Sequence, residues 1–365
     1  MRHPAGSRRS KQTFKEGTMA TIQHTVMRDF GAAIFAATGL PEDQARAAID
    51  HLVDSNLAGH DSHGVIRVPG YTASLVEGGI KAVNPKVERK SPGVEIWDAN
   101  RSFGIVLCRT AMQTAVDMAQ EHSFGAVGVY RSSHIGRLGD FPPLAAEQGC
   151  IGLLFLNGGG HFTAPFGGTS RRLPPSPISV SWPTPGPYPM MLDMTTSMAA
   201  GGKVAVHAAR GQEVPEGWLV DEDGNTVTDP HRFGGDNPVA MLPLGGPSGH
   251  KGYGLAMMVE ALAALTWSGV SAAEPTRGGR GYLAMAIKVE SFIDLEEYKN
   301  EMSILIDWVK SSKKMPGFDK IYFPGEIEAE TRAQREAEGI YLEDPTWNAI
   351  VEAAEKVGVA KPDID

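Results

Sequence analysis

One short stretch of the chain holds the side chains needed for acid–base chemistry on a small organic acid. Residues 59–69 read GHDSHGVIRVP and supply a hydroxyl at Ser62, an imidazole at His63 and a guanidinium at Arg67. If a helix resumes after Gly64, His63 and Arg67 are four positions apart and share one face of it. Arginine holds a carboxylate by a planar two-point contact, and histidine exchanges a proton with a neighbouring carbonyl oxygen. The stretch therefore favours a site for a 2-keto or 2-hydroxy acid.

The same stretch also has a purely structural interpretation. Glycines flank it, and they either let the backbone approach a small ligand or simply allow tight turns. In the second case it is a helix–loop–helix corner whose polar residues only cap helix ends. The residues of this stretch leave both interpretations open.

Composition narrows the class of protein. The chain has 365 residues, 42% of them hydrophobic and 21% charged, which is enough for one large domain or two ordinary ones with a substantial core. Its net charge of −9 argues against a nucleic-acid partner or an anionic membrane surface. An anionic cofactor would need local donors, such as backbone amides and a few basic side chains.

The cysteines and the termini point to the cytoplasm. Cys108 and Cys150 are too few for a disulfide framework and lie in apolar surroundings, which suits a reducing compartment. Residues 1–17 lack the apolar core of a secretory signal, so residues 1–18 are expected to be a disordered extension. The longest apolar candidate, 254–270, contains Glu260 and predicts a buried helix, not a membrane span.

The apolar pattern predicts a helical start followed by mixed helices and strands. Helices are expected over 21–39, 42–58, 65–77, 106–122, 141–148, 197–210, 252–267 and 295–311, with a charged helical tail over 326–357. Strands are expected over 87–97, 126–130, 151–156, 178–182, 190–193 and 282–289, with a hairpin turn at Asp223-Gly224. Polar residues 131–140 follow a strand directly, at the kind of strand end where ligands gather in such sheets.

A dinucleotide would have to bind here without the usual fingerprint. No G-x-G-x-x-G motif follows an early strand, so a Rossmann dinucleotide-binding unit is not expected. The best alternative is the glycine-rich segment 245–252, which places His250 and Lys251 at a helix start where free amides favour phosphate. A tight packing turn is the competing interpretation of that segment.

Metal and serine-nucleophile chemistry have weaker support. The side chains that could in principle ligate a metal are His60, Asp61, His63, His134, His161 and His250. They lack the H-x₃-H or C-x₂-C spacing of known metal sites, so no metal site is expected. Ser62 and His63 are sequence neighbours and no G-x-S-x-G elbow is present, which argues against a serine hydrolase.

Several longer segments, in one order along the chain, resemble a known family. They are HDSHGVIRVPGY from His60, SSHIGRLGDF from Ser132, APFGG from Ala164, LDMTTSMAAGGKVAVHAARG from Leu192, VPEGW from Val214, LPLGGPSGHKGYGLAMMVE from Leu242 and PGE from Pro324. Together they resemble the malate/L-lactate dehydrogenase family, which lacks a Rossmann fold. Its relatives include sulfolactate and ureidoglycolate dehydrogenases, diketogulonate reductase and the piperideine- and pyrroline-carboxylate reductases.

The resemblance implies an α/β fold in which a mixed β-sheet flanked by helices binds NAD(P) in a non-Rossmann manner. Residues 19–80 would form an N-terminal helical part, and 81–325 the NAD(P)-binding and catalytic core. Residues 326–365 would form a helical tail packed against the N-terminal part. The active site would lie near a homodimer interface.

The resemblance also implies roles for individual residues. His63 looks like the proton donor and acceptor, with Ser62 and Asp193 completing its relay, and Arg67 like the clamp for the substrate carboxylate. His134 looks like a contact to both substrate and cofactor, although some relatives assign the base to this position. The further dinucleotide contacts would be Ile135, Gly136, Arg137, Leu138, Asp193, Met194, Thr195, His250, Lys251, Pro324, Gly325 and Glu326.

One departure from the family pattern concerns the substrate side. Where relatives commonly carry Gly-Thr-Asn-Pro, this chain has Pro174-Pro175-Ser176-Pro177. Ser176 retains a hydroxyl that could contact substrate, but the asparagine amide is gone. The identity of the substrate therefore stays open.

The expected function is an NAD- or NADP-dependent oxidoreductase that transfers a hydride between nicotinamide and C2 of a small 2-hydroxy or 2-keto acid. Reduction of a cyclic imine carboxylate is the alternative within the family, and a catalytically silent ligand-binding relative is the alternative outside enzymes. Retention of Ser62, His63, Arg67 and Asp193 argues against the silent relative, because binding alone needs no proton relay. The choice between NAD and NADP stays open because there is no Rossmann acidic residue to read.

Overall fold

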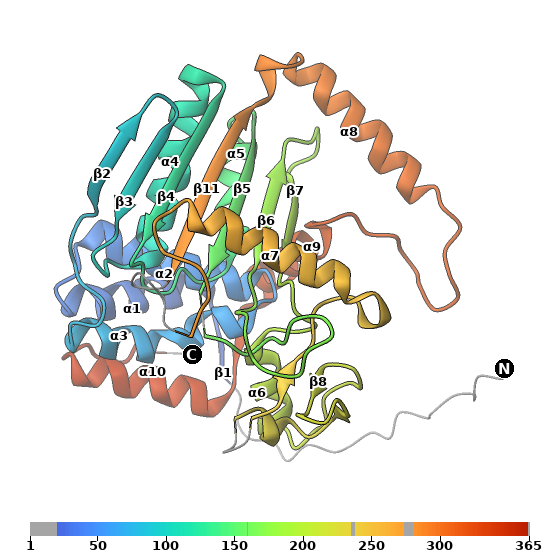
Figure 1. Ribbon diagram of the computed structural model, residues 1–365. Helices are drawn as coiled ribbons and strands as arrows, with labels where there is room; N and C mark the ends of the chain where they lie inside the picture. Colours follow the sequence, from blue (N-terminus) through green and yellow to red (C-terminus); the bar gives the residue numbers. More distant parts are fainter. Residues whose placement is uncertain (1–19, 159, 235–237, 274–279, 364–365) are drawn as a thin grey trace.

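The structure is a computed structural model that describes residues 20–158, 160–234, 238–273 and 280–363. Its centre is a seven-stranded sheet in the order β2-β3-β4-β11-β5-β6-β7 (Figure 1). Only β3 and β4 run parallel, and every other neighbouring pair in this sheet is antiparallel. The strands are β2 Lys86–Ser91, β3 Val94–Asp98, β4 Phe124–Tyr130, β5 Cys150–Asn157, β6 Ile178–Trp182, β7 Met190–Met194 and β11 Gly281–Lys288. The predicted mixed sheet is confirmed.

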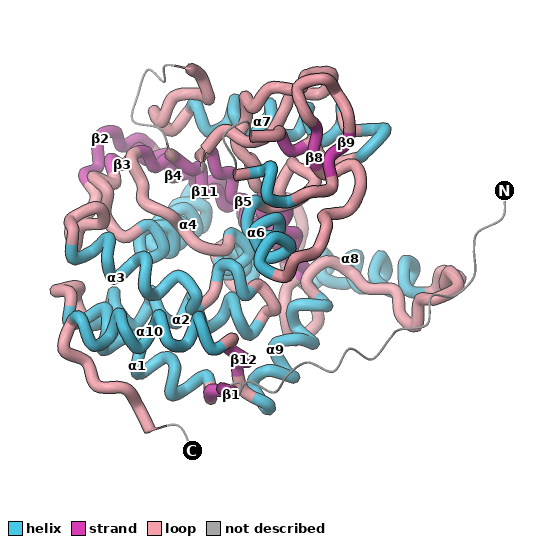
Figure 2. The backbone as a smooth tube through the Cα atoms, turned by 90° about the horizontal axis from the view of Figure 1, so that it is seen from below, coloured by secondary structure: helices cyan, strands magenta, loops and turns pink. Residues whose placement is uncertain are grey.

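Helices cover both faces of the sheet because alternate strand residues are apolar on both sides. Helices α4 (Gly104–His122) and α5 (Pro142–Ala146) pack on one face, where Tyr282 of β11 and Leu154 of β5 are buried. Helix α7 (His250–Ala264) packs on the other face, against Phe155 and Ile178. Figure 2 shows α4 and α7 on opposite sides of the row of strands.

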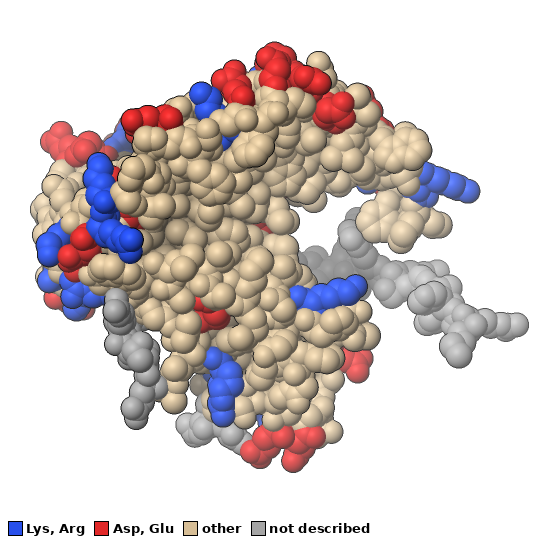
Figure 3. All heavy atoms as spheres, turned by 45° about the horizontal axis from the view of Figure 1, so that its top comes forward, with Lys and Arg blue, Asp and Glu red and all other residues tan. Residues whose placement is uncertain are grey.

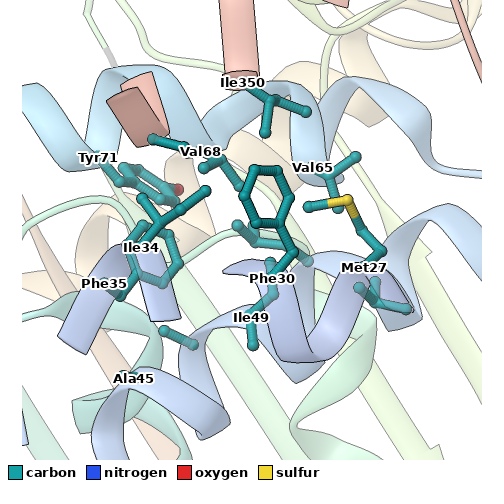
Figure 4. Packing of buried hydrophobic residues seen from close by; sticks show 14 of the residues in the cluster. Met27, Phe30, Ile34, Phe35, Ala45, Ile49, Val65, Val68, Tyr71 and Ile350 are labelled. Atoms are coloured by element: carbon teal, nitrogen blue, oxygen red, sulfur yellow. The ribbon is translucent and has the colours of Figure 1, made fainter. Parts of the chain in front are cut away.

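A second hydrophobic cluster is built from the two ends of the chain. It joins α1 (His24–Ala37), α2 (Glu42–Leu57), α3 (Val68–Val76) and α10 (Asp344–Lys356) around fully buried side chains (Figure 4). Short strands β1 (Ala20–Ile22) and β12 (Ile340–Leu342) pair antiparallel beneath it. The C-terminal segment therefore packs against the N-terminal helices. The domain boundaries at residues 80 and 325 stay predictions.

Two smaller parts extend from the sheet. The first holds α6 (Gly201–Ala209) and a three-stranded sheet of β8 (Leu219–Val220), β9 (Thr226–Val227) and β10 (Ala240–Met241). The second is an arm in which α8 (Leu295–Lys310) projects from the body before the chain returns through α9 (Glu326–Glu338) (Figure 1). No helix of the described ranges is long and apolar enough to cross a membrane.

The structure corrects four predicted elements. The strand expected over 87–97 is a hairpin that turns at Pro92-Gly93, where Gly93 has a φ of +71° that favours glycine. The helix expected from residue 197 begins at Gly201, and the one expected from residue 65 becomes regular only at Val68. The tail over 326–357 is two helices separated by Gly339 and β12, which pairs with β1.

Packing between α1 and α2 generates a stability prediction at Gly31. A Cβ on this residue would lie 2.3 Å from Cδ1 of Ile49, a fully buried side chain with little room to move. Glycine to alanine normally stabilises a helix by about 1 kcal/mol, but overpacking a core costs about 1–3 kcal/mol. We expect Gly31→Ala to give no gain and to lower the free energy of unfolding by up to about 2 kcal/mol, measured by urea unfolding.

The matched control is Gly254→Ala in α7, where a Cβ would meet nothing within 4 Å. This substitution should leave stability unchanged or raise it by up to about 1 kcal/mol. An equal gain from both substitutions would contradict the packing argument.

Candidate functional site

The segment that carries Ser62, His63 and Arg67 is a double 3₁₀ turn after α2. Its two turns are Asp61–His63 and Val65–Arg67. The Asn56 side chain holds both, because its Nδ2 donates to Asp61 Oδ1 at 2.7 Å and its Oδ1 accepts the N–H of Val65 at 2.8 Å. Gly64 lies against this amide, and a Cβ there would sit 2.1 Å from Asn56 Oδ1. The turn therefore requires both residues.

The structure brings Ser62, His63 and Arg67 together, but not on one helical face. Gly64 is extended (φ −87°, ψ −153°), so no helix runs from His63 to Arg67 and that step of the prediction was wrong. Instead, Arg67 Nε donates to the carbonyl oxygen of Ser62 at 2.8 Å. Ser62 Oγ lies 3.1 Å from His63 Nδ1. The hydroxyl, imidazole and guanidinium thus form one connected group.

His134 joins this group from the edge of the sheet. It lies in the loop after β4, and its ring stacks near that of His63 with centroids 6.0 Å apart and planes at 17°. Tyr71 of α3 places its hydroxyl 2.5 Å from His134 Nδ1. Two imidazoles from distant parts of the sequence therefore lie side by side where the helical cluster meets the sheet.

Both imidazoles are held in the neutral form. Burial lowers the pKa of His63 to about 4, and positive charge at Arg67 adds to this effect. Burial also lowers the pKa of His134 to about 3, with further contributions from His63, Arg280 and Arg67. Burial raises the pKa of Tyr71. Near pH 7 each imidazole can accept a proton, which is the requirement for a general base.

The loop after β4 is fixed by a buried histidine–aspartate pair. His51 of α2 contacts Asp140 Oδ2 through Nδ1 at 2.8 Å and accepts the N–H of Arg137 through Nε2 at 3.0 Å. Burial alone would raise the pKa of Asp140, but His51 and Arg137 lower it to about 2. Gly136 (φ +73°) passes so close that a Cβ would lie 2.0 Å from His51 Nε2. These contacts set the backbone that presents His134.

Asp193 contacts the same loop. It lies in β7, and its Oδ2 accepts the N–H of Gly139 at 2.7 Å. Burial raises the pKa of this carboxyl group. Asp193 therefore contacts the loop that carries His134. Direct participation of Asp193 in proton transfer with His63 stays a proposal. The adjacent Met194 and Thr195 are half-buried.

Residues 135–138 and 324–326 approach the same end of the sheet. Ile135 and Leu138 are buried, and so is Arg137, whose Nε and Nη1 have no hydrogen-bond partner in the part of the chain that the structure describes. The carbonyl oxygen of Pro324 accepts the N–H of Met191 in β7 at 3.0 Å.

Glu326 is engaged elsewhere. Its carboxylate lies 2.6 Å from Lys310 Nζ and 2.7 Å from Lys320 Nζ. Burial would raise the pKa of this carboxyl group, but the two lysines outweigh it and the pKa is lowered. The pair of lysines neutralises Glu326 and ties the arm to the start of α9.

His250 and Lys251 lie apart from the imidazoles, at the first turn of α7. Both are exposed, and the His250 ring packs edge-on against Phe166 with centroids 5.6 Å apart. Free amides at a helix start favour a phosphate. Close packing alone also explains the glycine at position 252, since a Cβ there would lie 2.3 Å from the carbonyl oxygen of Leu244. The phosphate-cradle and packing-turn interpretations therefore both stand.

The Ser176 hydroxyl is hydrogen-bonded within its own loop. Ser176 is fully buried at a φ of +40°, and its Oγ points to the carbonyl oxygen of Pro174 at 3.4 Å. The carbonyl oxygen of Pro175 accepts from both the N–H and the hydroxyl of Thr196. This proline-rich loop is thus tied to the segment after β7, and a substrate contact by Ser176 stays a proposal.

The described ranges contain no cluster of three or more histidine, cysteine, aspartate or glutamate side chains suited to hold a metal ion. Acid–base groups and guanidinium groups are what this site offers.

Comparison with known proteins identifies the family. Residues 22–351 match the model of the malate/L-lactate dehydrogenase family. The chain is 35% identical over 341 residues to a malate dehydrogenase of Pyrococcus abyssi, covering 90% of this chain and 93% of that protein. It is 32% identical to an L-lactate dehydrogenase of Cupriavidus necator, covering 93% and 99%. The solved sulfolactate dehydrogenase of Methanocaldococcus jannaschii superposes with a TM-score of 0.84 at 31% identity, over 93% and 98% of the two chains.

The chain belongs to the malate/L-lactate dehydrogenase family. Its relatives are named as dehydrogenases of hydroxy acids, so it is an oxidoreductase that acts on CH–OH donors. The resemblance inferred from the motifs is confirmed.

Sequence reasoning missed four residues of the site in this dehydrogenase, two of them as a pair. Tyr71 follows Arg67 by four residues in a helix, so the same spacing rule that was applied to His63 and Arg67 would have found it. The His51–Asp140 pair spans 89 positions, and no local pattern signals it. Arg280, which acts on both His134 and Tyr71, lies next to β11 without any recognisable motif.

The buried imidazoles should make the dehydrogenase acid-sensitive. In the unfolded chain histidine has a pKa near about 6.5, against about 4 for His63 and about 3 for His134 in the folded state. Between these values the unfolded state binds more protons, so stability is complete above about pH 6.5 and falls as pH drops toward 4 and 3. We expect His63→Asn to reduce the loss of melting temperature between about pH 7.5 and about pH 5.

The exposed His231 provides the matched control, because its substitution by asparagine should leave that pH dependence as in the wild type. If His63→Asn loses as much melting temperature as the wild type over the same interval, the burial argument is wrong.

Proposed function

We propose that this family member is an NAD- or NADP-dependent oxidoreductase that transfers a hydride between nicotinamide and C2 of a small 2-hydroxy or 2-keto acid. The observation that carries the proposal is the neutral His63 imidazole beside the Arg67 guanidinium. Arg67 makes no ion pair with an acidic side chain of the described residues. A guanidinium without its own carboxylate, next to a neutral imidazole, suits a substrate that brings both a carboxylate and an exchangeable proton.

The residues divide the work as follows. Arg67 binds the C1 carboxylate and so fixes C2 in the site, a positioning effect worth several kcal/mol. His63 forms a hydrogen bond with the Ser62 hydroxyl through Nδ1, which leaves Nε2 for the substrate hydroxyl. During oxidation His63 accepts the hydroxyl proton as the C2–H bond breaks, and it returns a proton to the carbonyl oxygen during reduction. When bound, the nicotinamide supplies the two-electron acceptor or donor for this reaction.

The proposed cofactor contacts are compatible with an anionic dinucleotide. Arg137 pairs with Asp140 through Nη2 at 4.0 Å, but its buried Nε and Nη1 have no partner in the described ranges and could donate to a phosphate. Residues 135–138, 193–195 and 324–325 meet near β7 through the Gly139–Asp193 and Met191–Pro324 contacts. His250 and Lys251 would serve a phosphate at α7.

The proposed setting is the cytoplasm. Cys108 and Cys150 are both free and buried, and reducing compartments keep such thiols unpaired. The proposed partners are a small-molecule acid and a second copy of the chain, with no nucleic acid or membrane among them.

The deciding experiment compares His63→Ala with His134→Ala. We expect His63→Ala to lower kcat by about 10²- to 10⁴-fold with nearly unchanged affinity for NAD(P)H, because it removes the proton acceptor. His134→Ala should weaken cofactor or substrate binding more than it slows the bound complex. The measurements are kcat and the nicotinamide Kd between about pH 5.5 and about pH 9, after the active pair has been found in a substrate-by-cofactor matrix.

The matrix covers malate, lactate, sulfolactate, ureidoglycolate and the cyclic imine carboxylates with NAD and NADP. Loss of turnover in His134→Ala with binding intact, together with an active His63→Ala, would reverse the two roles. Turnover of cyclic imines alone would replace the hydroxy-acid proposal by the imine alternative.

We further propose that the protein is a homodimer held through the α8 arm. No residue of α8 is buried, yet the arm exposes large apolar side chains, namely Phe292, Ile304, Leu305, Trp308, Val309, Met315 and Phe318. Trp308 is 76% exposed, and such a surface is typical of a protein interface. Figure 3 shows the arm standing off from the body beside a recess, with acidic side chains along its outer edge and mostly uncharged side chains toward the recess.

Trp308→Glu should weaken this dimer. Burying a charge in place of an aromatic anchor should raise the dimer dissociation constant by about 30-fold or more. A dilution series in sedimentation velocity measures it, and Val76→Glu, at an exposed apolar site on α3, is the control. A wild-type protein that stays monomeric at every concentration, or equal effects of both substitutions, would refute the dimer proposal.

A further inference from the structure

A second arginine, Arg280, lies at the same edge of the sheet as His134. It immediately precedes β11, and its carbonyl oxygen accepts the N–H of Ser132, two residues before His134, at 3.2 Å. Gly158 at the end of β5 makes room for its side chain, since a Cβ on Gly158 would lie 2.8 Å from Arg280 Cγ. The fold thus directs a guanidinium to the place where β4 and β5 end.

The charge of Arg280 is not neutralised by the described part of the chain. The side chain is half-buried, and burial lowers the pKa of its guanidinium. Only Tyr71 raises that pKa, and the Tyr71 hydroxyl is already hydrogen-bonded to His134. No ion pair joins Arg280 to a described carboxylate. Leaving a guanidinium partly desolvated and unpaired is costly, which is typical of a position that binds an anion.

Arg280 and Arg67 both act on the same pair of side chains, His134 and Tyr71. Both lower the pKa of His134 and that of Tyr71. Arg67 also lowers the pKa of His63. Both arginines therefore lie near the His134–Tyr71 pair, and Arg67 lies near His63 as well.

We infer that Arg280 binds a second anionic group of the substrate, so that the site selects dianionic over monoanionic 2-hydroxy acids. This inference rests on the function proposed above. With the C1 carboxylate at Arg67 and the C2 hydroxyl at His63, a carboxylate or sulfonate further along the substrate meets Arg280. A monoanionic acid would leave Arg280 partly desolvated and unpaired, and such an unpaired charge discriminates between substrates. Relatives are named for malate, lactate and sulfolactate, so family membership leaves this choice open.

The test compares kcat/KM for malate and sulfolactate with that for lactate, using one cofactor at saturation. The wild type should prefer the two dianionic acids. Arg280→Gln should lower kcat/KM for them by roughly 10- to 100-fold and leave lactate within about threefold. Arg280→Lys should keep part of the preference, because it retains the charge but loses the two-point contact.

Two further variants make the result specific. Arg67→Lys should lower kcat/KM for all three acids by roughly 10- to 1000-fold with an unchanged cofactor Kd, because every substrate shares the C1 carboxylate. Arg109→Gln removes an exposed arginine of α4 and should change nothing.

The possible outcomes distinguish failure of the Arg280 role from failure of the proposed dehydrogenase function. If no hydroxy acid is turned over with either cofactor, the proposed function fails and the inference fails with it. If lactate is used as well as malate, or Arg280→Gln leaves their ratio unchanged, only the role of Arg280 is overturned. Should Arg280→Gln not fold, Arg280→Lys decides, and an unchanged ratio in that variant overturns the role.

Discussion

The chemistry of this protein depends on burial where a helical cluster meets the edge of a sheet. The cluster of α1, α2, α3 and α10 brings His63 and Tyr71 against the loop that carries His134. Removal of water is the largest single influence on the pKa of each imidazole, ahead of any neighbouring charge. The Asn56 amide and the His51–Asp140 pair supply the hydrogen bonds that polar backbone needs at such a junction. Without them, polar backbone and side-chain groups at the junction would be buried without partners.

The regular elements of the fold could be predicted because their signals are local. Strand β6 begins and ends at the predicted residues, and most helix bounds fall within a few positions, since apolar periodicity and glycine or proline punctuation mark them. The short pair β1 and β12 could not be predicted, because three-residue strands gain their stability from each other across the whole chain. The 3₁₀ turns around Gly64 were equally hidden, as a side chain from the preceding helix imposes them.

The site residues likewise differ in whether a local sequence signal could predict them. Ser62, His63 and Arg67 were predictable as a group because they are neighbours in sequence, although the reason given for their proximity was a helix that does not exist. His134 came from family motifs. Partners that join distant segments, such as Tyr71 with His134, are set by tertiary packing, which one sequence does not reveal.

The packing of the C-terminal segment against the N-terminal helices has a consequence for synthesis on the ribosome. The sheet is complete once β11 has been made, but the turn bearing His63 is braced by Arg335, whose guanidinium binds Asp61 at 2.6 Å. Ala20 finds its partner only at Leu342. Domains form as their residues emerge, and contacts between distant residues form late. The sheet of the growing polypeptide can therefore form before α9 is available to brace the turn that bears His63 and before β12 is available to pair with β1.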